Sequence, residues 1–576
     1  METPCQSAIT ERMSLNQNRW LARAFPLLSG GSLVFAFPNW NQEWVVWLWL
    51  LPLLAVIWGT REVRRPFWPG YLAGLAFFIP NLAWVRHSSR VMAGAVDHSW
   101  LGLGPELMGF GALIGLSAYC AVYFGLWSWF VHRYARPDLK KLTQGSWQES
   151  TWESLRCALL AAGAWVACEW LRSTTVFTGF GWNGLGVGLH QNRVLIQVAD
   201  LVGVMGLSFL PVLVICTAWN ALRRMLHLYH GTGTCRTRLD FTVALMVLLS
   251  AAGYGVMRIT AKPVDSVLVR TLLVQPNVSQ VDAWSGRFAP QVYERLAKFT
   301  RLYAESRVGN SGMDLVIWPE SALPVHLHGQ PERWGLPKHE TFFNDLLQSG
   351  DFSLITGTEL YDSSEHGPGG HVSAVLFRGS YAHRQDYHKV HLVPFGEYLP
   401  FGDYPPFSLL RGVIPGDFEP GKSTEPLKLE KPDVGIIPLI CFEDTVGRLA
   451  RRFVRPGPQM IVNITTDGWF LQSNEMEVHT ANAKFRAIEL RRPMVRATNT
   501  GVTCFIDTLG TVTHRLADPE TGSTLIEGCL PGEVKVPSTG EMTLYARHGD
   551  WFALLCLAAC VVLVSRRRLR RRSCQP

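Results

Sequence analysis

Three residues in the second half of the chain could together perform acyl transfer through a thioester. Cys441 follows the apolar, β-prone run 435–440, Glu320 follows the strand-like run 313–318, and Lys389 lies between them in the sequence. A free cysteine is mostly a thiol at neutral pH, with a pKa of about 8.5, so it needs a base or a nearby cation to become a nucleophile. Glu320 could take the thiol proton if partial desolvation raises its pKa, and Lys389 could stabilise the oxyanion of a tetrahedral intermediate.

Each of these residues has a simpler interpretation when it is considered alone. Cys441 could be a core cysteine, because cysteine is among the residues most often buried. Glu320 could belong to an acidic turn after a strand, and Lys389 could be an ordinary surface lysine. The chemical hypothesis therefore requires all three residues to meet at strand ends, where rigid elements can hold side chains in a pocket.

The segment 263–549 is predicted to form a soluble α/β domain that carries these residues. Charged residues, Pro, Gly and His become frequent there, and short β-rich runs alternate with helical stretches. Pro319 cannot donate to a β-ladder, so it is expected to end a strand directly before Glu320. A chain of 576 residues is also too long for one ordinary core, which indicates at least two domains.

Eight apolar runs surround this domain and predict transmembrane helices. Hydrophobic residues make up 48% of the chain and charged residues 17%, and the 22 Trp crowd near the apolar runs, as is typical of membrane interfaces. A span needs about 20 apolar residues, so the second, fifth and seventh runs are marginal without burial against neighbouring helices. The runs are 24–41, 44–60, 66–85, 109–131, one that starts at 157, 201–222, 241–257 and 551–565.

The basic residues indicate how these runs cross the membrane. With eight spans, the basic clusters at 12–23, 61–65, 132–141, 223–238 and 566–572 all fall on one side. The positive-inside rule makes that side cytoplasmic. The predicted organisation is a membrane domain of seven helices (1–262), an outer domain (263–549) and a last helix with a basic cytoplasmic tail (550–576), with both termini inside.

The net charge and the cysteine content exclude several other classes of protein. The formal charge of +8 arises from clusters beside apolar runs, so it does not indicate nucleic-acid binding. The 12 Cys contain no CxxC pair and no Cys/His metal spacing, and they do not indicate a disulfide framework. His326, His328 and His339 also lack the spacing of a metal site, so no metal is expected.

The order of a strand-end Glu, a Lys and a strand-end Cys resembles the carbon–nitrogen hydrolase (nitrilase) superfamily. Longer motifs over nearly the whole chain resemble the apolipoprotein N-acyltransferase family within it. In the outer domain they are VQPNVSQ (274–280), WPES (318–321), KVHLVPFGE (389–397), CFE (441–443), NITTDGWF (463–470) and RAIELRRPMVRATNTGVT (486–503). In the membrane half they are FAFPNWN (35–41), EWLRS (169–173) and TGFGWN (178–183).

This resemblance implies an α-β-β-α sandwich, eight spans and a Glu320–Lys389–Cys441 triad. Cys441 would take an acyl chain from a membrane phospholipid and pass it to the N-terminal amine of S-diacylglyceryl-cysteine on an apolipoprotein, without a cofactor. The enzyme would be located in the inner membrane of a bacterium, with its catalytic domain on the periplasmic face.

The resemblance also implies supporting residues around the triad. Glu397 and Glu443 would orient Lys389 or the incoming amine, and Trp284 would gate or contact lipid, although it could equally be an aromatic residue that packs in a loop. Phe442 stands where tyrosine is common in the family, so a phenolic hydroxyl is absent at that position.

Two other functions are compatible with parts of the sequence. A membrane-anchored amidase would use the same triad with water as acceptor, but eight spans exceed what a soluble substrate requires. A transporter or scaffold with an inactive outer domain would favour charged residues within the spans. Only Glu169, Arg172 and Asp200 qualify, and all three are expected near the outer ends of their spans.

Overall fold

The computed structural model describes residues 19–59, 63–89, 104–279, 288–305, 312–361, 370–402, 404, 417–470 and 473–572. These residues form two compact units. The first comprises the described residues of Met1–Ala83, Gly111–Thr260 and Asp550–Pro576, and the second those of Trp84–Phe110 and Ala261–Gly549. The terminal helix is thus grouped with the N-terminal helices, and Trp84–Phe110 with the α/β unit.

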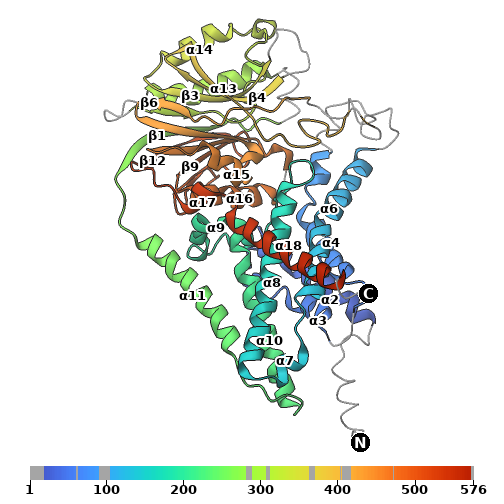
Figure 1. Ribbon diagram of the computed structural model, residues 1–576. Helices are drawn as coiled ribbons and strands as arrows, with labels where there is room; N and C mark the ends of the chain where they lie inside the picture. The colour runs from blue at the N-terminus through green and yellow to red at the C-terminus, as the bar shows by residue number, and fades with distance from the viewer. Residues whose placement is uncertain are drawn as a thin grey trace, which may run out of the picture. The chain divides into compact units, whose positions relative to one another are not determined.

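Two six-stranded sheets form the centre of the second unit (Figure 1). The first sheet has the order β12 (Gly528–Pro537), β1 (Ser266–Gln275), β2 (Leu315–Ile317), β3 (Ser353–Tyr361), β4 (Gly370–Arg378), β5 (Ser380–His388). The second has the order β11 (Val512–Arg515), β10 (Cys504–Ile506), β9 (Met494–Thr498), β8 (Gln459–Thr465), β7 (Asp433–Ile440), β6 (Leu427–Glu430).

The strand directions determine at which strand ends Glu320, Lys389 and Cys441 lie. In the first sheet β1, β2 and β3 run parallel, and β5 has the same direction because β3–β4 and β4–β5 are both antiparallel. In the second sheet β7, β8 and β9 run parallel. Glu320 follows β2, Lys389 follows β5 and Cys441 follows β7, so each stands just beyond the carboxyl end of its strand.

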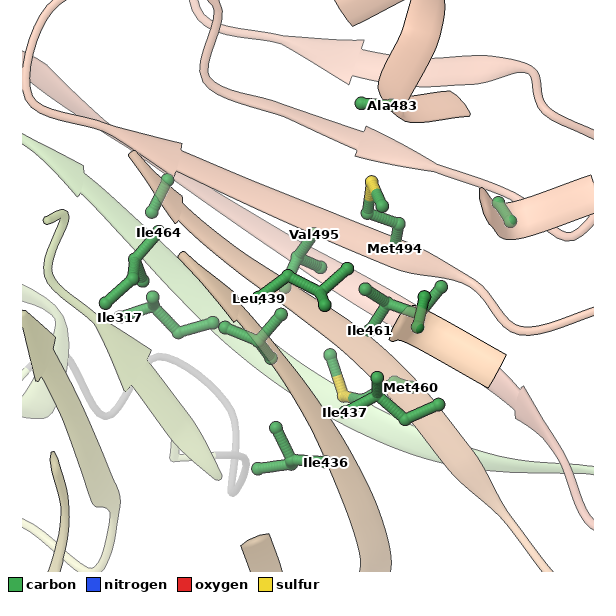
Figure 2. Packing of buried hydrophobic residues seen from close by; sticks show 14 of the residues in the cluster. Ile317, Ile436, Ile437, Leu439, Met460, Ile461, Ile464, Ala483, Met494 and Val495 are labelled. Carbon is green, nitrogen blue, oxygen red and sulfur yellow. The ribbon is translucent and has the colours of Figure 1, made fainter. Parts of the chain in front are cut away.

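Apolar side chains fill the space between the sheets. Ile317 from the first sheet belongs to one buried cluster with Ile436, Leu439 and Ile461 from the second (Figure 2). Burying a side chain of this size contributes about 1.5–3 kcal/mol, so the interface between the sheets is a major source of stability. The runs that lead to Glu320 and Cys441 are therefore anchored in the core.

Helices cover the outer face of each sheet. On the first sheet, α13 (Ala289–Glu305) and α14 (His339–Leu347) contribute Leu296 and Phe343 to a second cluster. On the second sheet, α16 (Glu475–Leu490) contributes Ala483 and Ala487 to the inner cluster. Figure 1 shows α13 and α14 beside the first sheet and α16 beside the second. The layers are helix, sheet, sheet and helix, as the resemblance implied.

The first unit is helical. Its helices are α2 (Arg19–Leu33), α3 (Leu51–Ile57), α4 (Phe67–Asn81), α6 (Pro105–Tyr134, which continues from the second unit), α7 (Leu139–Gln144), α8 (Trp147–Thr174), α9 (Ala199–Leu207), α10 (Phe209–Tyr229), α11 (Leu239–Thr260) and α18 (Trp551–Arg572). Among the described residues, four helices are long and apolar enough to cross a membrane: α6, α8, α10 and α11. The predicted fifth and seventh runs, which were marginal by composition, thus form helices long enough to cross a membrane. A count of eight spans is not confirmed.

Two of the predicted runs are divided between consecutive helices. The run 44–60 is divided into the 3-10 helix Glu43–Trp47 and α3, which has a proline in its first turn. The run 201–222 is divided between α9 and α10, and Gly203 in α9 has a φ of 72°, which no right-handed helix contains. Shorter apolar helices also cover Ala22–Ala36 and Trp551–Arg566.

Candidate active site

The turn that begins with Cys441 has an unusual backbone. β7 ends at Ile440, and Cys441 starts a 3-10 turn, Cys441–Thr445, with a φ of 50°. This left-handed conformation is uncommon for a residue with a Cβ and costs on the order of 1–3 kcal/mol, so surrounding contacts must hold it. It reverses the chain directly after the strand and leaves the thiol at the strand end.

Lys389 lies between two carboxylates in the interior. Its side chain is fully buried, and its Nζ lies 2.5 Å from Glu397 Oε1 and 3.5 Å from Glu320 Oε1. Glu397 Oε2 accepts a hydrogen bond from the backbone N–H of Val393 at 2.8 Å, which closes the loop around the lysine. Charge-assisted hydrogen bonds of this kind are stronger than neutral ones, so the ammonium group is held in one place.

Glu320 is also held from the second sheet. Its Oε2 accepts a hydrogen bond from the backbone N–H of Thr466, which follows β8, at 3.1 Å. Behind it, β3 must approach closely, since a Cβ on Gly357 would lie 2.5 Å from the Cα of Glu320. A glycine is therefore required at position 357 for the loop that carries Glu320 to lie against β3.

The charges around Cys441 shift its protonation and that of its neighbours. Burial, and then the charge of Glu320, raise the pKa of the Cys441 thiol, although Lys389 opposes them. Burial raises the pKa of Glu320, with Lys389 again opposing. Burial alone would lower the pKa of Lys389, but Glu397 and Glu320 outweigh it and the net shift is upward. These shifts favour the thiol form of Cys441 and the ammonium form of Lys389, and the thiol can react only if a base accepts its proton.

Glu443 organises the backbone around the site. Its carboxylate accepts hydrogen bonds from the Tyr387 hydroxyl (2.9 Å) and from the backbone N–H groups of Val390 (2.8 Å), His391 (2.9 Å) and Ile440 (2.9 Å). It therefore ties the segment after Lys389 to the strand end before Cys441. Burial raises the pKa of Glu443 to about 7, although the charge of Lys389 opposes this shift.

Replacing Glu443 by glutamine should destabilise this arrangement. Glu443→Gln turns an acceptor into an NH2 group that must face at least one of these N–H donors, which costs about 1–3 kcal/mol. Thermal unfolding in detergent at pH 8, where the native carboxylate is ionised, measures the loss. Tyr387→Phe removes only one donor and should cost less, and equal unfolding temperatures for Glu443→Gln and the wild type would contradict this account.

The other predicted site residues have different outcomes. Phe442 stacks on His391, with ring centroids 5.8 Å apart and an interplanar angle of 22°, so its ring packs beside the nucleophile turn. Trp284 lies outside the described residues. The sequence reasoning did not single out Thr466, whose backbone N–H donates to Glu320. Its place directly after the buried strand β8 was the signal that could have identified it.

Among the residues that the structure describes, no group of three or more His, Cys, Asp or Glu side chains could hold a metal ion. The reactive groups at this site are the Cys441 thiol, the Glu320 carboxyl group and the Lys389 ammonium group. These are the groups that acyl transfer through a thioester requires.

Comparison with known proteins gives two family matches. Residues 29–217 match the apolipoprotein N-acyltransferase N-terminal domain, and residues 274–534 match the carbon–nitrogen hydrolase family. Among solved structures, the carbon–nitrogen hydrolase from Helicobacter pylori G27 is 17% identical, covers 46% of this chain and 89% of its own, and has a TM-score of 0.31.

Whole-length relatives extend the match to both units. The apolipoprotein N-acyltransferase of Geobacter metallireducens is 31% identical over 549 residues, which is 94% of each chain. That of Bradyrhizobium diazoefficiens is 31% identical over 572 residues, which is 96% of each chain. The motifs predicted this relationship, and it is confirmed: the chain belongs to the apolipoprotein N-acyltransferase family.

Proposed function

We propose that this chain transfers an acyl chain from a membrane phospholipid to the N-terminal amine of S-diacylglyceryl-cysteine on apolipoproteins, through a thioester on Cys441. Membership of the family supports a role in lipoprotein N-acylation. The observation that carries the mechanism is the buried Lys389 between Glu320 and Glu397, since the charges of Lys389 and Glu320 shift the pKa of the Cys441 thiol. The acyl donor and acceptor come from the family resemblance.

In the first half-reaction, Glu320 takes the thiol proton as the sulfur attacks the ester carbonyl of the phospholipid. Lys389 stabilises the oxyanion that forms. The intermediate collapses when the C–O bond breaks, and the leaving alkoxide takes the proton from Glu320, which releases a lysophospholipid. Glu397 keeps the Lys389 ammonium in position throughout.

In the second half-reaction, the uncharged α-amine of the apolipoprotein attacks the thioester. Glu320 takes a proton from the attacking nitrogen, and Lys389 stabilises the second oxyanion. The C–S bond then breaks, and the Cys441 thiolate regains a proton from Glu320. The reaction is ping-pong, because the lysophospholipid leaves before the amine reacts.

The location follows from the substrates, both of which are lipids. We propose that 1–262 and 550–576 cross the inner membrane with eight helices and that 263–549 is the periplasmic catalytic domain, with both termini in the cytoplasm. The four long apolar helices and the basic clusters at the predicted inner ends support this arrangement. The bilayer is thus both the solvent of the helical unit and the source of the acyl donor.

Intact-protein mass spectrometry after incubation with phospholipid tests the function. A mass gain of one acyl chain, absent from Cys441→Ala, is expected. Adding a diacylated lipopeptide should remove the mass and yield a triacylated product. Loss of the mass to free fatty acid with no acylated lipopeptide would instead support the amidase-like alternative, which the carbon–nitrogen hydrolase match keeps open. No mass gain in the wild type would contradict the thioester.

Lys389→Ala should slow thioester formation by roughly 10²–10³-fold, because the oxyanion loses its preorganised cation. Single-turnover kinetics with phospholipid measure this rate. Lys428→Ala provides a control, since that lysine is 65% exposed and lies on β6. Turnover near the wild-type rate in folded Lys389→Ala would remove the lysine from the mechanism.

A further inference from the structure

A buried cluster of charged residues lies directly behind the nucleophile turn. It consists of Asp444 in that turn, Asp467 in the turn after β8, His479 on α16 and Arg496 on β9, and none of them is more than 1% exposed. The mechanism above uses none of these side chains.

Arg496 is the centre of the cluster. Its Nη1 donates to Asp444 Oδ2 at 2.9 Å, and its Nη2 donates to both oxygens of Asp467 at 3.0 Å. One planar guanidinium group therefore joins the turn after β7 to the turn after β8. A lysine has a single nitrogen at its end and cannot make this fork of contacts.

His479 links the same two carboxylates from α16. Its Nε2 lies 2.9 Å from Asp444 Oδ1 and its Nδ1 lies 2.9 Å from Asp467 Oδ1. Arg496 Nη2 and His479 Nδ1 therefore both contact Oδ1 of Asp467, and these two nitrogens lie 2.8 Å apart. Burial and the Arg496 charge lower the pKa of His479, but the two carboxylates outweigh them and the net shift is upward.

Asn463 connects this cluster to Cys441 itself. Its Oδ1 accepts a hydrogen bond from Arg496 Nη1 at 3.1 Å, and its Nδ2 donates to the carbonyl oxygens of Cys441 and Leu439, both at 3.3 Å. Arg496 thus reaches both ends of the nucleophile turn, through Asp444 at one end and through Asn463 at the other. These contacts surround the residue whose φ is 50°.

The cluster is also adjacent to the group that holds Glu320. Asp467 directly follows Thr466, whose backbone N–H donates to the carboxylate of Glu320. Fixing Asp467 against Arg496 therefore fixes the segment that contacts the base.

Stability alone is a weak reason for such a cluster. Buried ion pairs often contribute less than well-packed apolar groups of the same volume, because desolvation offsets their attraction. Misplacing reacting groups by about 1 Å can cost 10²-fold in rate. Orientation of the thiol is therefore the larger benefit that these contacts can provide.

We propose that Arg496 and Asn463 are positioning residues that hold Cys441 in its left-handed conformation and so orient its thiol toward Glu320 for acylation. This inference rests on the proposed function of the site. Neither residue touches a reacting atom, and both act through the backbone of the Cys441 turn.

The test compares two buried amides on the same strand. Asn463→Ala should slow single-turnover thioester formation roughly 10–100-fold at saturating phospholipid, with little change in KM, and Arg496→Lys should behave alike. Gln459→Ala is the matched control. Its side chain is also buried on β8, but its amide bonds to Phe453 and Arg455, which lie outside the Cys441–Thr445 turn. Gln459→Ala should therefore lose a similar amount of stability without slowing acylation.

A second variant separates the two ends of the Asn463 side chain. Asn463→Asp keeps the acceptor for Arg496 and removes the donor to the Cys441 and Leu439 carbonyls, and it replaces Asn463→Ala if that variant fails to fold. Its acylation should also be slow, whereas wild-type rates in the Asn463 variants, or equal slowing in Gln459→Ala, would overturn the inference. If the wild type itself forms no thioester, the proposed function fails instead, so the two failures are distinct.

Discussion

Cys441→Ala should abolish the acyl-enzyme and all transfer to lipopeptide. The alanine side chain has no atom that can form the thioester, and removing a covalent nucleophile costs on the order of 10⁶-fold in kcat where its partners act as a unit with it. The fold should be retained, because alanine fits the space of the thiol and β7 ends before this position. Intact mass after incubation with phospholipid, together with the yield of acylated lipopeptide, measures the effect.

The matched control for this variant is another free cysteine of the same unit. Cys529 is half-buried on β12, and Tyr303 is the side chain that interacts with its thiol. Cys529→Ala should acquire the acyl mass at the wild-type rate. Acylation that persists in Cys441→Ala, or that disappears in Cys529→Ala, would show that the thioester forms elsewhere.

Glu320→Gln should slow thioester formation by roughly 10²–10⁴-fold, the usual contribution of a general base. The glutamine carbonyl can still accept from the N–H of Thr466, so the loop should keep its position while the side chain loses the ability to take a proton. Single-turnover mass spectrometry measures the rate. Glu359→Gln on β3 removes a half-buried carboxylate from the same sheet and should leave the rate unchanged.

The pH dependence of acylation provides a second test of Glu320 as the general base. The base works only when ionised, and burial raises its pKa above the ordinary carboxyl range. Acylation should therefore decline as the pH falls through this raised pKa, so the acid limb of the kcat/KM profile lies above the usual carboxyl titration. The residual activity of Glu320→Gln should lack that limb. Normal acyl-enzyme formation in Glu320→Gln would exclude the glutamate as the base.

Much of the α/β unit could be predicted from local sequence patterns. The apolar runs before Glu320 and Cys441 form β2 and β7, and their side chains are buried between the sheets. The period of two in strands and the tendency of proline to end a ladder depend on nearby residues only. For that reason these strand ends were accessible without a structure.

The helical unit was harder to predict. Hydropathy sums over a window, so it does not record where the backbone changes direction inside an apolar run. The kink inside α9 lies at Gly203, whose φ of 72° is outside the right-handed helical region, and a change of backbone direction there does not alter the hydropathy. Four helices satisfy the length and composition of a span in the described part of the chain, where eight runs had been predicted.

The sequence by itself determined which residues could react and the family to which they belong. The order of Glu320, Lys389 and Cys441, with the motifs around them, was sufficient because motifs are local. Only the tertiary structure decided how they meet. It shows that Glu397 lies 2.5 Å from Lys389 while Glu320 lies 3.5 Å away, that Glu443 binds backbone N–H groups, and that Arg496 connects two turns. The physical reason is that these contacts depend on the pairing of strands and on the packing of two sheets, which bring together residues far apart in the chain.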